Sequence, residues 1–281
     1  LGYFALGNQN FTSATDTLNT AVGYHAGITV STGLKNTFVG ALAGDGTDDG
    51  AENVAVGHEA LSANCGNANV AVGQSSLVAC TASNNTGVGH DAGKGIIGGE
   101  NNTLIGNTAG YNIATGDNNI FLGFNITGSD VGIDNEIMIG NGRAAAGTNT
   151  VKIGTAGGAA VLGLDGSDTS WAASSDSRLK RDVVTSTVGL DFIKDLRPVT
   201  YKWEAKNAVA DSLPQYDADS SDPVYGSGKT QHGFIAQEVK TAIDAHSGLK
   251  NGFTMWREDP DGTQEVAPAA LIPMLTKALQ E

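Results

Sequence analysis

The sequence predicts a mainly β protein in which a rod of stacked repeats precedes a small α+β domain. Ten glycines recur at intervals of 16 or 17 residues, apart from a last step of 14. A short, nearly fixed period indicates one structural unit stacked many times, with each unit gaining its core from its neighbours. The period ends where the composition changes, near residue 174. The ten glycines are Gly7, Gly23, Gly40, Gly57, Gly73, Gly89, Gly106, Gly123, Gly140 and Gly154.

Each repeat follows the pattern Asn-x-x-aliphatic-Gly-x-x-Ala-Gly/Leu, as in residues 19–27 and 36–44. The apolar runs are short, lie between Gly and Asn, and lack a 3.6-residue period, which is typical of strands. We expect the glycine to supply an unusual φ or room for neighbouring backbone, and the asparagine to form a turn. The aliphatic residues that precede the glycines, from Leu6 to Ile153, are expected to stack into a continuous core. Small residues such as Ala26 would let the walls approach closely.

The two parts of the chain differ in composition, and both carry a net negative charge. Residues 1–174 hold 32 of the 39 glycines, no proline and a net charge of −10. Residues 175–281 hold all six prolines and a net charge of −4. Neither part has a basic face, so nucleic-acid binding is not expected. No run of 18 apolar residues occurs, so no membrane insertion is expected. Because the chain starts inside a repeat, we expect the native protein to extend further upstream.

Several side chains of the repeat region could form a disulfide or bind a metal, but for each of them an ordinary structural role is favoured. Cys65 and Cys80 occupy nearly equivalent places on successive coils, so a disulfide and a pair of half-buried free thiols both remain open. His58 and His90 follow repeat glycines and could form metal-binding rings in an oligomer, but surface histidines are favoured. The acidic cluster at 45–52 lacks the spacing of a known calcium loop. We therefore predict no metal site and no cofactor.

The C-terminal part carries the patterns of a small α+β domain. Trp203 and Trp256 are interpreted as core residues. The expected elements are a helix ended by Pro198 within 187–198, a strand at 199–203, a surface loop at 204–229, a strand leading into a helix at 230–248, a hairpin at 253–266 and a terminal helix at 267–281.

Four motifs in this part occur in a fixed order and carry a family resemblance. They are Ser-Asp-x-Arg-Leu-Lys at 175–180, Pro-Val-x-Tyr-x-Trp at 198–203, Gly-Phe-Ile-Ala-Gln-Glu-Val at 233–239 and Leu-Ile-Pro-x-Leu at 271–275. Together they resemble the intramolecular chaperone domain of endosialidases and tail spikes, the peptidase S74 family. The resemblance implies a domain that trimerises a fibrous β protein and then cuts itself off before the serine of the first motif.

Carried over to this chain, the resemblance makes Ser175 and Lys180 a catalytic dyad and Ser174–Ser175 the scissile bond. Attack by the Ser175 hydroxyl on the preceding carbonyl needs no diffusing substrate, which is equivalent to about 10⁵–10⁸ M of effective concentration. The lysine must act as a neutral base, so its pKa must fall from its usual value of about 10.4. Arg178 and Arg181 supply like charge, and assembly would supply burial. Positions i and i+5 share no face of a helix or strand, so the dyad needs a turn or a Lys180 from a neighbouring protomer.

Other polar residues of the motifs are expected to support the structure. Asp176 and Arg178 are interpreted as a turn with a salt bridge rather than as catalytic groups. His232 is a candidate base or orienting group, although a packed histidine before the strand is favoured. Gln237 and Glu238 would contact a partner chain or cap the following helix.

The repeats at residues 3–154 resemble the head repeats of trimeric autotransporter adhesins and similar repeats of phage tail fibres. That resemblance implies a left-handed β-roll or an interwound β-prism, assembled as a parallel homotrimer. The predicted domains are repeats at 1–123, a degenerate repeat and neck at 124–174, and the chaperone autoprotease at 175–281.

The sequence therefore predicts a fragment of a phage-type tail fibre or appendage. Its C-terminal chaperone would direct homotrimerisation and then cleave each chain once, as a single-turnover serine autoprotease. The product would be assembled in the host cytoplasm and reside in the virion, with a host cell-surface glycan or protein as receptor. The alternative is an extracellular bacterial adhesin that retains the C-terminal domain as a trimerisation cap. A glycan-degrading site in the rod is disfavoured, because no paired carboxylates at defined spacing stand out.

Overall fold

A computed structural model describes two compact units, and each is considered by itself. The first spans Leu1–Leu179 and the second Lys180–Glu281. The predicted domain boundary after residue 174 lies five residues before this division. The described residues are 2–9, 15–142, 144–164, the backbone of 172–173, 175–226, 228–250 and 252–281.

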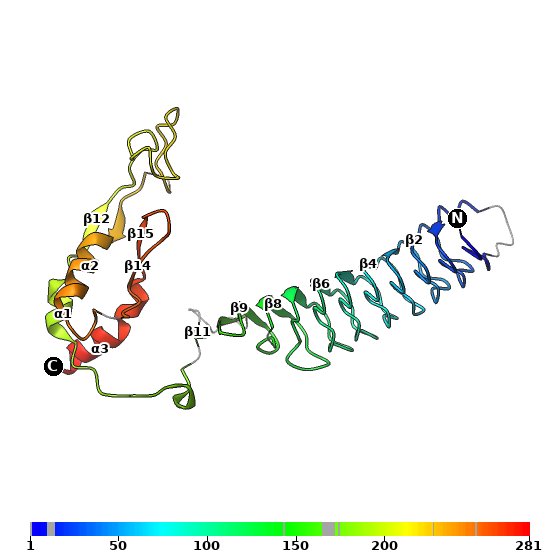
Figure 1. The fold of residues 1–281 in the computed structure, drawn as a ribbon, viewed down its shortest axis with the longest axis horizontal. Helices are drawn as coiled ribbons and strands as arrows, with labels where there is room; N and C mark the ends of the chain where they lie inside the picture. The colour runs from blue at the N-terminus through cyan, green and yellow to red at the C-terminus, as the bar shows by residue number, and fades with distance from the viewer. Residues whose placement is uncertain are drawn as a thin grey trace. The chain divides into compact units, whose positions relative to one another are not determined.

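The first unit is a β-solenoid, which confirms the predicted mainly β fold. Its coils follow one another in chain order, and each contributes one strand to a single eleven-stranded sheet (Figure 1). The strands are β1 (Thr20–Val22), β2 (Thr37–Val39), β3 (Val54–Val56), β4 (Val70–Val72), β5 (Thr86–Val88), β6 (Thr103–Ile105), β7 (Ile120–Phe124), β8 (Glu136–Asn141), β9 (Thr150–Thr155), β10 (Gly158–Gly163) and β11 (Ala172–Ala173).

Strands β1 to β9 pair in parallel and in the register of the sequence repeat. Val56 lies opposite Val72, and Gly140 lies opposite Gly154. Residues 124–155, whose sequence departs from the repeat motif, therefore continue the same stacking. The direction then reverses, because β10 pairs antiparallel with β9 and β11 pairs antiparallel with β10.

The alignment of the first coil on Gly7 is wrong, because Gly2 occupies the repeat position. The backbone nitrogen of His25 donates to the carbonyl of Tyr3, just as that of Leu42 donates to Tyr24. The sequence that fits the repeat is thus Gly-Tyr-Phe-Ala-Leu at 2–6. Sequence reasoning missed it because the step from Gly2 to Gly23 is longer than the other steps.

The predicted core of residues that precede the glycines is also wrong. Side chains of a strand alternate between its two faces, and the face that points into the solenoid carries the middle residue of each three-residue strand and the second residue of β7. The inward residues include Ala21, Phe38, Ala55, Ala71, Leu104 and Phe121, all of them buried. The aliphatic residues before the glycines point outward. Seven of them are 36–45% exposed, namely Val22, Val39, Val56, Ile105, Leu122, Ile139 and Ile153.

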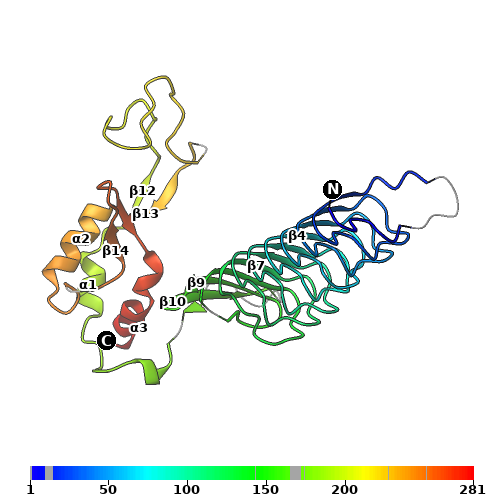
Figure 2. The ribbon, with the colours of Figure 1, turned by 45° about the vertical axis from the view of Figure 1, so that its right-hand side comes forward.

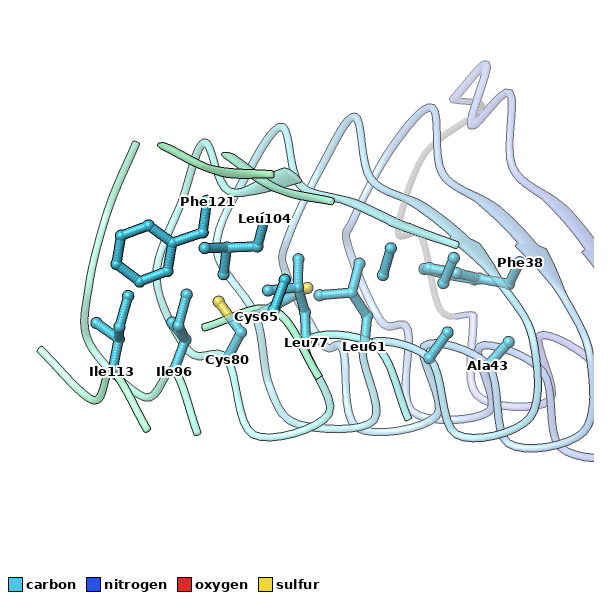
Figure 3. Packing of buried hydrophobic residues seen from close by; sticks show 14 of the residues in the cluster. Phe38, Ala43, Leu61, Cys65, Leu77, Cys80, Ile96, Leu104, Ile113 and Phe121 are labelled. Atoms are coloured by element: carbon cyan, nitrogen blue, oxygen red, sulfur yellow. The ribbon is translucent and has the colours of Figure 1, made fainter. Parts of the chain in front are cut away.

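The interior is filled by buried hydrophobic side chains, such as Leu104 and Phe121 from the strands and Ile96 and Ile113 from elsewhere in the coils (Figure 3). In two coils with a large inward strand residue, those of Phe38 and Leu104, a glycine follows six residues later. A Cβ built on Gly44 would lie 2.3 Å from the Phe38 ring. Two coils with an inward alanine, Ala55 and Ala71, have leucine there, and Ala55 and Leu61 are both fully buried. In these four coils the sizes of the two positions therefore complement each other, whereas Ala21 and Gly87 both have glycine six residues later.

The repeat asparagines form a buried ladder rather than isolated turns. Each side-chain oxygen accepts the backbone N–H of the asparagine one coil later, at 3.0 Å from Asn102 to Asn85. Each amide also donates to a backbone carbonyl of the next coil, at 2.9 Å from Asn102 to Gly116. The ladder ends at Glu136, whose own N–H donates to Asn119 at 2.9 Å. The fully buried Glu136 carboxylate accepts the N–H groups of Ser129 and Gly147.

The residue before each ladder position, and Asn149 before β9, adopt a left-handed backbone, with φ between 53° and 63°. This conformation suits asparagine, and the later coils have asparagine there. The nine residues are Leu18, Lys35, Glu52, Ala68, Asn84, Asn101, Asn118, Asn135 and Asn149.

We expect Ala68→Asn to stabilise the solenoid by about 1 kcal/mol, because asparagine tolerates this φ better than alanine. The Ala68 side chain is exposed and its N–H bond to Ala51 is retained, so no packing is lost. Thermal melting at fixed protein concentration measures the gain. Ala41→Asn is the matched control, because Ala41 has no positive φ and should change stability by less than about 0.5 kcal/mol. Equal shifts for both variants would contradict the prediction.

Cys65 and Cys80 are free thiols, as the favoured interpretation predicts, but they are buried rather than half-buried. The Cys65 sulfur lies 3.2 Å from the Thr47 hydroxyl, and the Asn85 amide donates to the Cys80 sulfur at 3.4 Å. Burial raises the pKa of Cys65 to about 11 and also raises the pKa of Cys80. Both groups are therefore protonated thiols at neutral pH.

The second unit is the predicted small α+β domain with a C-terminal helix, and an arm extends from β12 and β13 (Figure 2). Helices α1 and α2 and the 3₁₀ segment before α3 pack on one core, with Phe192, Val239, Met255 and Leu271 buried. The elements are α1 (Leu190–Asp195), β12 (Val199–Tyr201), β13 (Gln231–Gly233), α2 (Ala236–Ala245), β14 (Trp256–Glu258), β15 (Gln264–Val266), the 3₁₀ segment Pro268–Leu271 and α3 (Ile272–Gln280).

Candidate self-cleavage site and chaperone module

The first motif lies directly after the last strand of the large sheet and forms a tight turn. A 3₁₀ segment spans Ser177–Leu179. The Asp176 carboxylate accepts the backbone N–H of Arg178 at 2.9 Å and its Nε at 3.0 Å. These two residues thus form the turn and salt bridge that the sequence suggested.

The ion pair changes the protonation of both partners. Hydrogen bonds from Arg178 lower the pKa of Asp176, and the carboxylate raises the pKa of Arg178. Arg178 is exposed and Asp176 is partly exposed, so the contact fixes the shape of the turn and adds little stability.

The candidate dyad straddles the division between the two units. Ser175 belongs to the first unit and Lys180 to the second. Ser174, on the other side of the candidate scissile bond, lies outside the described residues.

The later motifs meet within the second unit. Strand β12 carries the second motif and β13 leads into the third, and Val199 pairs with Gly233. Arg197, just before the second motif, donates from Nε to Glu238 of the third motif at 3.0 Å. This contact lowers the pKa of Glu238 and raises that of Arg197. Leu271 of the fourth motif is buried in the same core.

His232 lies on β13 opposite Thr200, and its side chain is exposed. It also lines a cavity of about 890 Å³ in the second unit. The cavity is bounded by β12 and β13, by the start of α2, by β15 and by the base of the arm. Its lining includes Tyr201, Trp203, Leu213, Tyr225, Phe234 and Val266.

Sequence reasoning missed this cavity, and its interpretation of Trp203 as core is wrong. Trp203 is 39% exposed and packs edge-to-face between Tyr201, at 5.2 Å between ring centroids, and Tyr225, at 4.8 Å. Tyr225 comes from the predicted surface loop, so the aromatic row depends on a contact between distant segments. Trp256 is half-buried and packs against the domain core.

The arm that follows Trp203 is built by its own backbone hydrogen bonds. The N–H of Lys206 donates to Asp222, and that of Val224 donates to Glu204. Between residues 204 and 224 the arm carries five acidic side chains and one basic side chain. It is an acidic projection, and Glu204, Val209 and Leu213 from it line the cavity.

Comparison with protein families assigns the C-terminal module. Residues 175–248 match the peptidase S74 family, described as the chaperone of endosialidase. The match begins at Ser175 and contains the first three motifs, which confirms the resemblance that they carry. It ends before the fourth motif at 271–275. No curated protein and no solved structure matches the chain. Among the described residues, no helix is both long enough and apolar enough to cross a membrane.

Proposed function

We propose that this chain is part of a tail-fibre-like homotrimer whose C-terminal module aligns three copies and then cleaves itself off at Ser174–Ser175. The family match at 175–248 supports a chaperone of a fibrous protein, and the β-solenoid supplies the fibrous part. The main reason to propose a trimer is the row of aliphatic side chains that point outward from the solenoid.

This row is continuous along the parallel strands. Nine strands at about 4.8 Å each give a strip about 40 Å long. Monomeric soluble proteins rarely expose so long an apolar strip. Because every coil presents its aliphatic residue at the same place, identical copies aligned in parallel would bury the strip along its whole length.

Self-cleavage would proceed by a shift of the acyl group followed by hydrolysis. The Ser175 Oγ attacks the carbonyl carbon of Ser174 while the neutral Lys180 amine takes the hydroxyl proton. The Oγ–C bond forms, the C–N bond breaks, and the lysine returns the proton to the leaving amine. Water then hydrolyses the ester, which leaves a carboxylate on Ser174 and restores the Ser175 hydroxyl.

The position of the Ser174–Ser175 bond suits removal of the C-terminal module. All eleven strands of the large sheet precede it, and the last of them, β11, ends at Ala173. The second unit keeps its own hydrophobic core. Cleavage would therefore remove no strand from the shaft.

We expect Ser175→Ala and Lys180→Ala each to leave an intact chain of 28.6 kDa, because each removes one member of the dyad. The unchanged chain should yield a fragment that begins at Ser175. Mass spectrometry and N-terminal sequencing measure the outcome, and sedimentation measures assembly. Ser177→Ala, two residues away in the same turn, is the control and should cleave normally. A trimer of the unchanged chain that stays intact would refute self-cleavage, and a monomer would refute the assembly.

A further inference from the structure

We infer that Asp176 is a positioning residue for self-cleavage, because it holds a turn that lets Ser175 and Lys180 of the same chain act together. This role rests on the proposed function and specifies how its dyad is arranged. Three features carry it: the backbone bond that closes the turn, the hydrogen bonds that Asp176 accepts from Arg178, and the place of the dyad at the two ends of the turn.

The turn occupies the four residues between the two members of the dyad. The backbone N–H of Leu179 donates to the carbonyl of Asp176 at 3.1 Å, which closes the turn. At the rise of a 3₁₀ segment its three steps cover about 6 Å, whereas three extended steps would cover about 10 Å. Ser175 directly precedes the turn and Lys180 directly follows it. The spacing Ser-x₄-Lys therefore fits a four-residue turn with one reacting group at each end.

The Asp176 side chain stabilises this turn at its start. Its carboxylate accepts the backbone N–H of Arg178 at 2.9 Å and the Nε of Arg178 at 3.0 Å. The first turn of a helical segment leaves its N–H groups without carbonyl partners, and a side-chain oxygen can supply the missing acceptor. Hydrogen bonds from Arg178 lower the pKa of Asp176, so the carboxylate is ionised at neutral pH and both of its oxygens accept.

The ion pairs of this segment favour a role in position over a role in charge. The sequence suggests that Arg178 and Arg181 bring like charge close to Lys180. In the structure the Asp176 carboxylate binds the Arg178 guanidinium, and a carboxylate oxygen of Asp182 lies 3.7 Å from the Arg181 Nε. Each carboxylate offsets the charge of its arginine. We therefore assign to Asp176 the shape of the turn, and not the supply of an electrostatic field at the dyad.

A dyad arranged by this turn belongs to one chain. The bonds described above join residues 176–179 of a single chain, so the turn needs no partner to form. The long, flexible stem of Lys180 would bridge the distance that remains to the Ser175 hydroxyl. Reacting groups must approach to about 3–3.5 Å, and a misplacement of about 1 Å can cost about 100-fold in rate. A loosened turn should therefore slow cleavage, while assembly depends on the apolar row of β1 to β9 and stays unchanged.

Substitutions at Asp176 in the full chain test this role, with the cleavage rate measured by mass spectrometry and assembly by sedimentation. Asp176→Ala should lower the rate about tenfold or more without preventing assembly. Asp176→Asn keeps an oxygen that accepts the Arg178 N–H, so its rate should stay within about threefold of the unchanged chain. Asp182→Ala is the matched control, because it removes the other carboxylate beside an arginine and should cleave normally. Normal cleavage by Asp176→Ala, or no rescue by Asp176→Asn, would overturn the inference.

Mixed assemblies test whether the dyad belongs to one chain. Chains with Ser175→Ala and chains with Lys180→Ala carry different affinity tags and are produced together, and purification on both tags isolates the mixed assemblies. These contain a serine and a lysine only on different chains, so we expect no cleavage of either chain. Cleavage of the Lys180→Ala chain in a mixed assembly would mean that a neighbouring lysine serves it, which overturns the inference and leaves the proposed function intact. An unchanged chain that assembles without being cleaved would refute the proposed function itself.

Discussion

Replacing Gly57 by alanine is expected to destabilise the solenoid by at least about 4 kcal/mol. Gly57 has φ 138°, a conformation that residues with a Cβ rarely adopt. A Cβ at this position would lie 2.5 Å from the carbonyl oxygen and 2.6 Å from the carbonyl carbon of Gly73 in the next coil. Both atoms belong to backbone held by the parallel strands, so neither can move without breaking the stacking. The added methyl group therefore strains one coil and pushes its neighbour away.

Thermal and urea unfolding followed by circular dichroism, at fixed protein concentration, measure this loss. Gly98→Ala is the matched control in the same unit. A Cβ at Gly98 meets no atom within 4 Å and its φ is not positive. This variant should stay within about 0.5 kcal/mol of the unchanged chain or gain slightly. If Gly57→Ala melted like Gly98→Ala, the close stacking of the glycines would be refuted.

Asn102→Leu is expected to cost about 3–5 kcal/mol, because it interrupts the buried asparagine ladder. The Asn102 amide donates to Asn85 and to the carbonyl of Gly116. Its side-chain oxygen accepts the backbone N–H of Asn119 at 3.0 Å and its amide at 2.9 Å. Leucine has a similar volume but fills none of these roles. The carbonyl of Gly116 and the N–H of Asn119 would lose these partners in a site that is closed to water.

The same unfolding measurements test this prediction, with Asn107→Leu as the control. Asn107 lies five residues later in the same coil, and its side chain is exposed. That variant should change stability by less than about 1 kcal/mol. A small loss for Asn102→Leu would mean that the ladder contributes little beyond the apolar packing.

The period of the glycines was sufficient to predict the stacking and the strands, because only a repeated unit places glycine against glycine in successive coils. It did not reveal which face of the strand points inward. Three-residue strands such as Thr-Phe-Val at 37–39 offer two apolar residues on opposite faces. The residues that precede the glycines, such as Val39, form the more uniform row of aliphatic side chains, and uniformity alone favours that row as the core. The varied row that includes Phe38 is the core, and in four coils, such as those of Phe38 and Ala55, its size changes are compensated six residues later. That compensation is visible in the sequence once the two positions are compared.

The helices and the hairpin of the second unit were predictable because their signals are local, such as Pro198 after α1. The cavity was not, because it joins Trp203 to Tyr225 and β13 to β15 across long stretches of chain. The motifs identified Ser175 and Lys180 through resemblance, and their joint action stays a prediction. Two isolated side chains carry no local pattern that distinguishes a catalytic pair from ordinary surface residues.

The reversal of direction at the β9–β10 hairpin also limits how the shaft associates at its end. A stack of parallel strands leaves an edge on which a further coil, or the first coil of another molecule, can continue the sheet. Here β10 runs against β9, and the short strand β11 pairs with Ala160 and Val161 of β10. The last full-length strand thus presents the wrong polarity for another parallel coil. The hairpin therefore ends the parallel stacking at β9, and a further parallel coil would have to displace β10 to continue it.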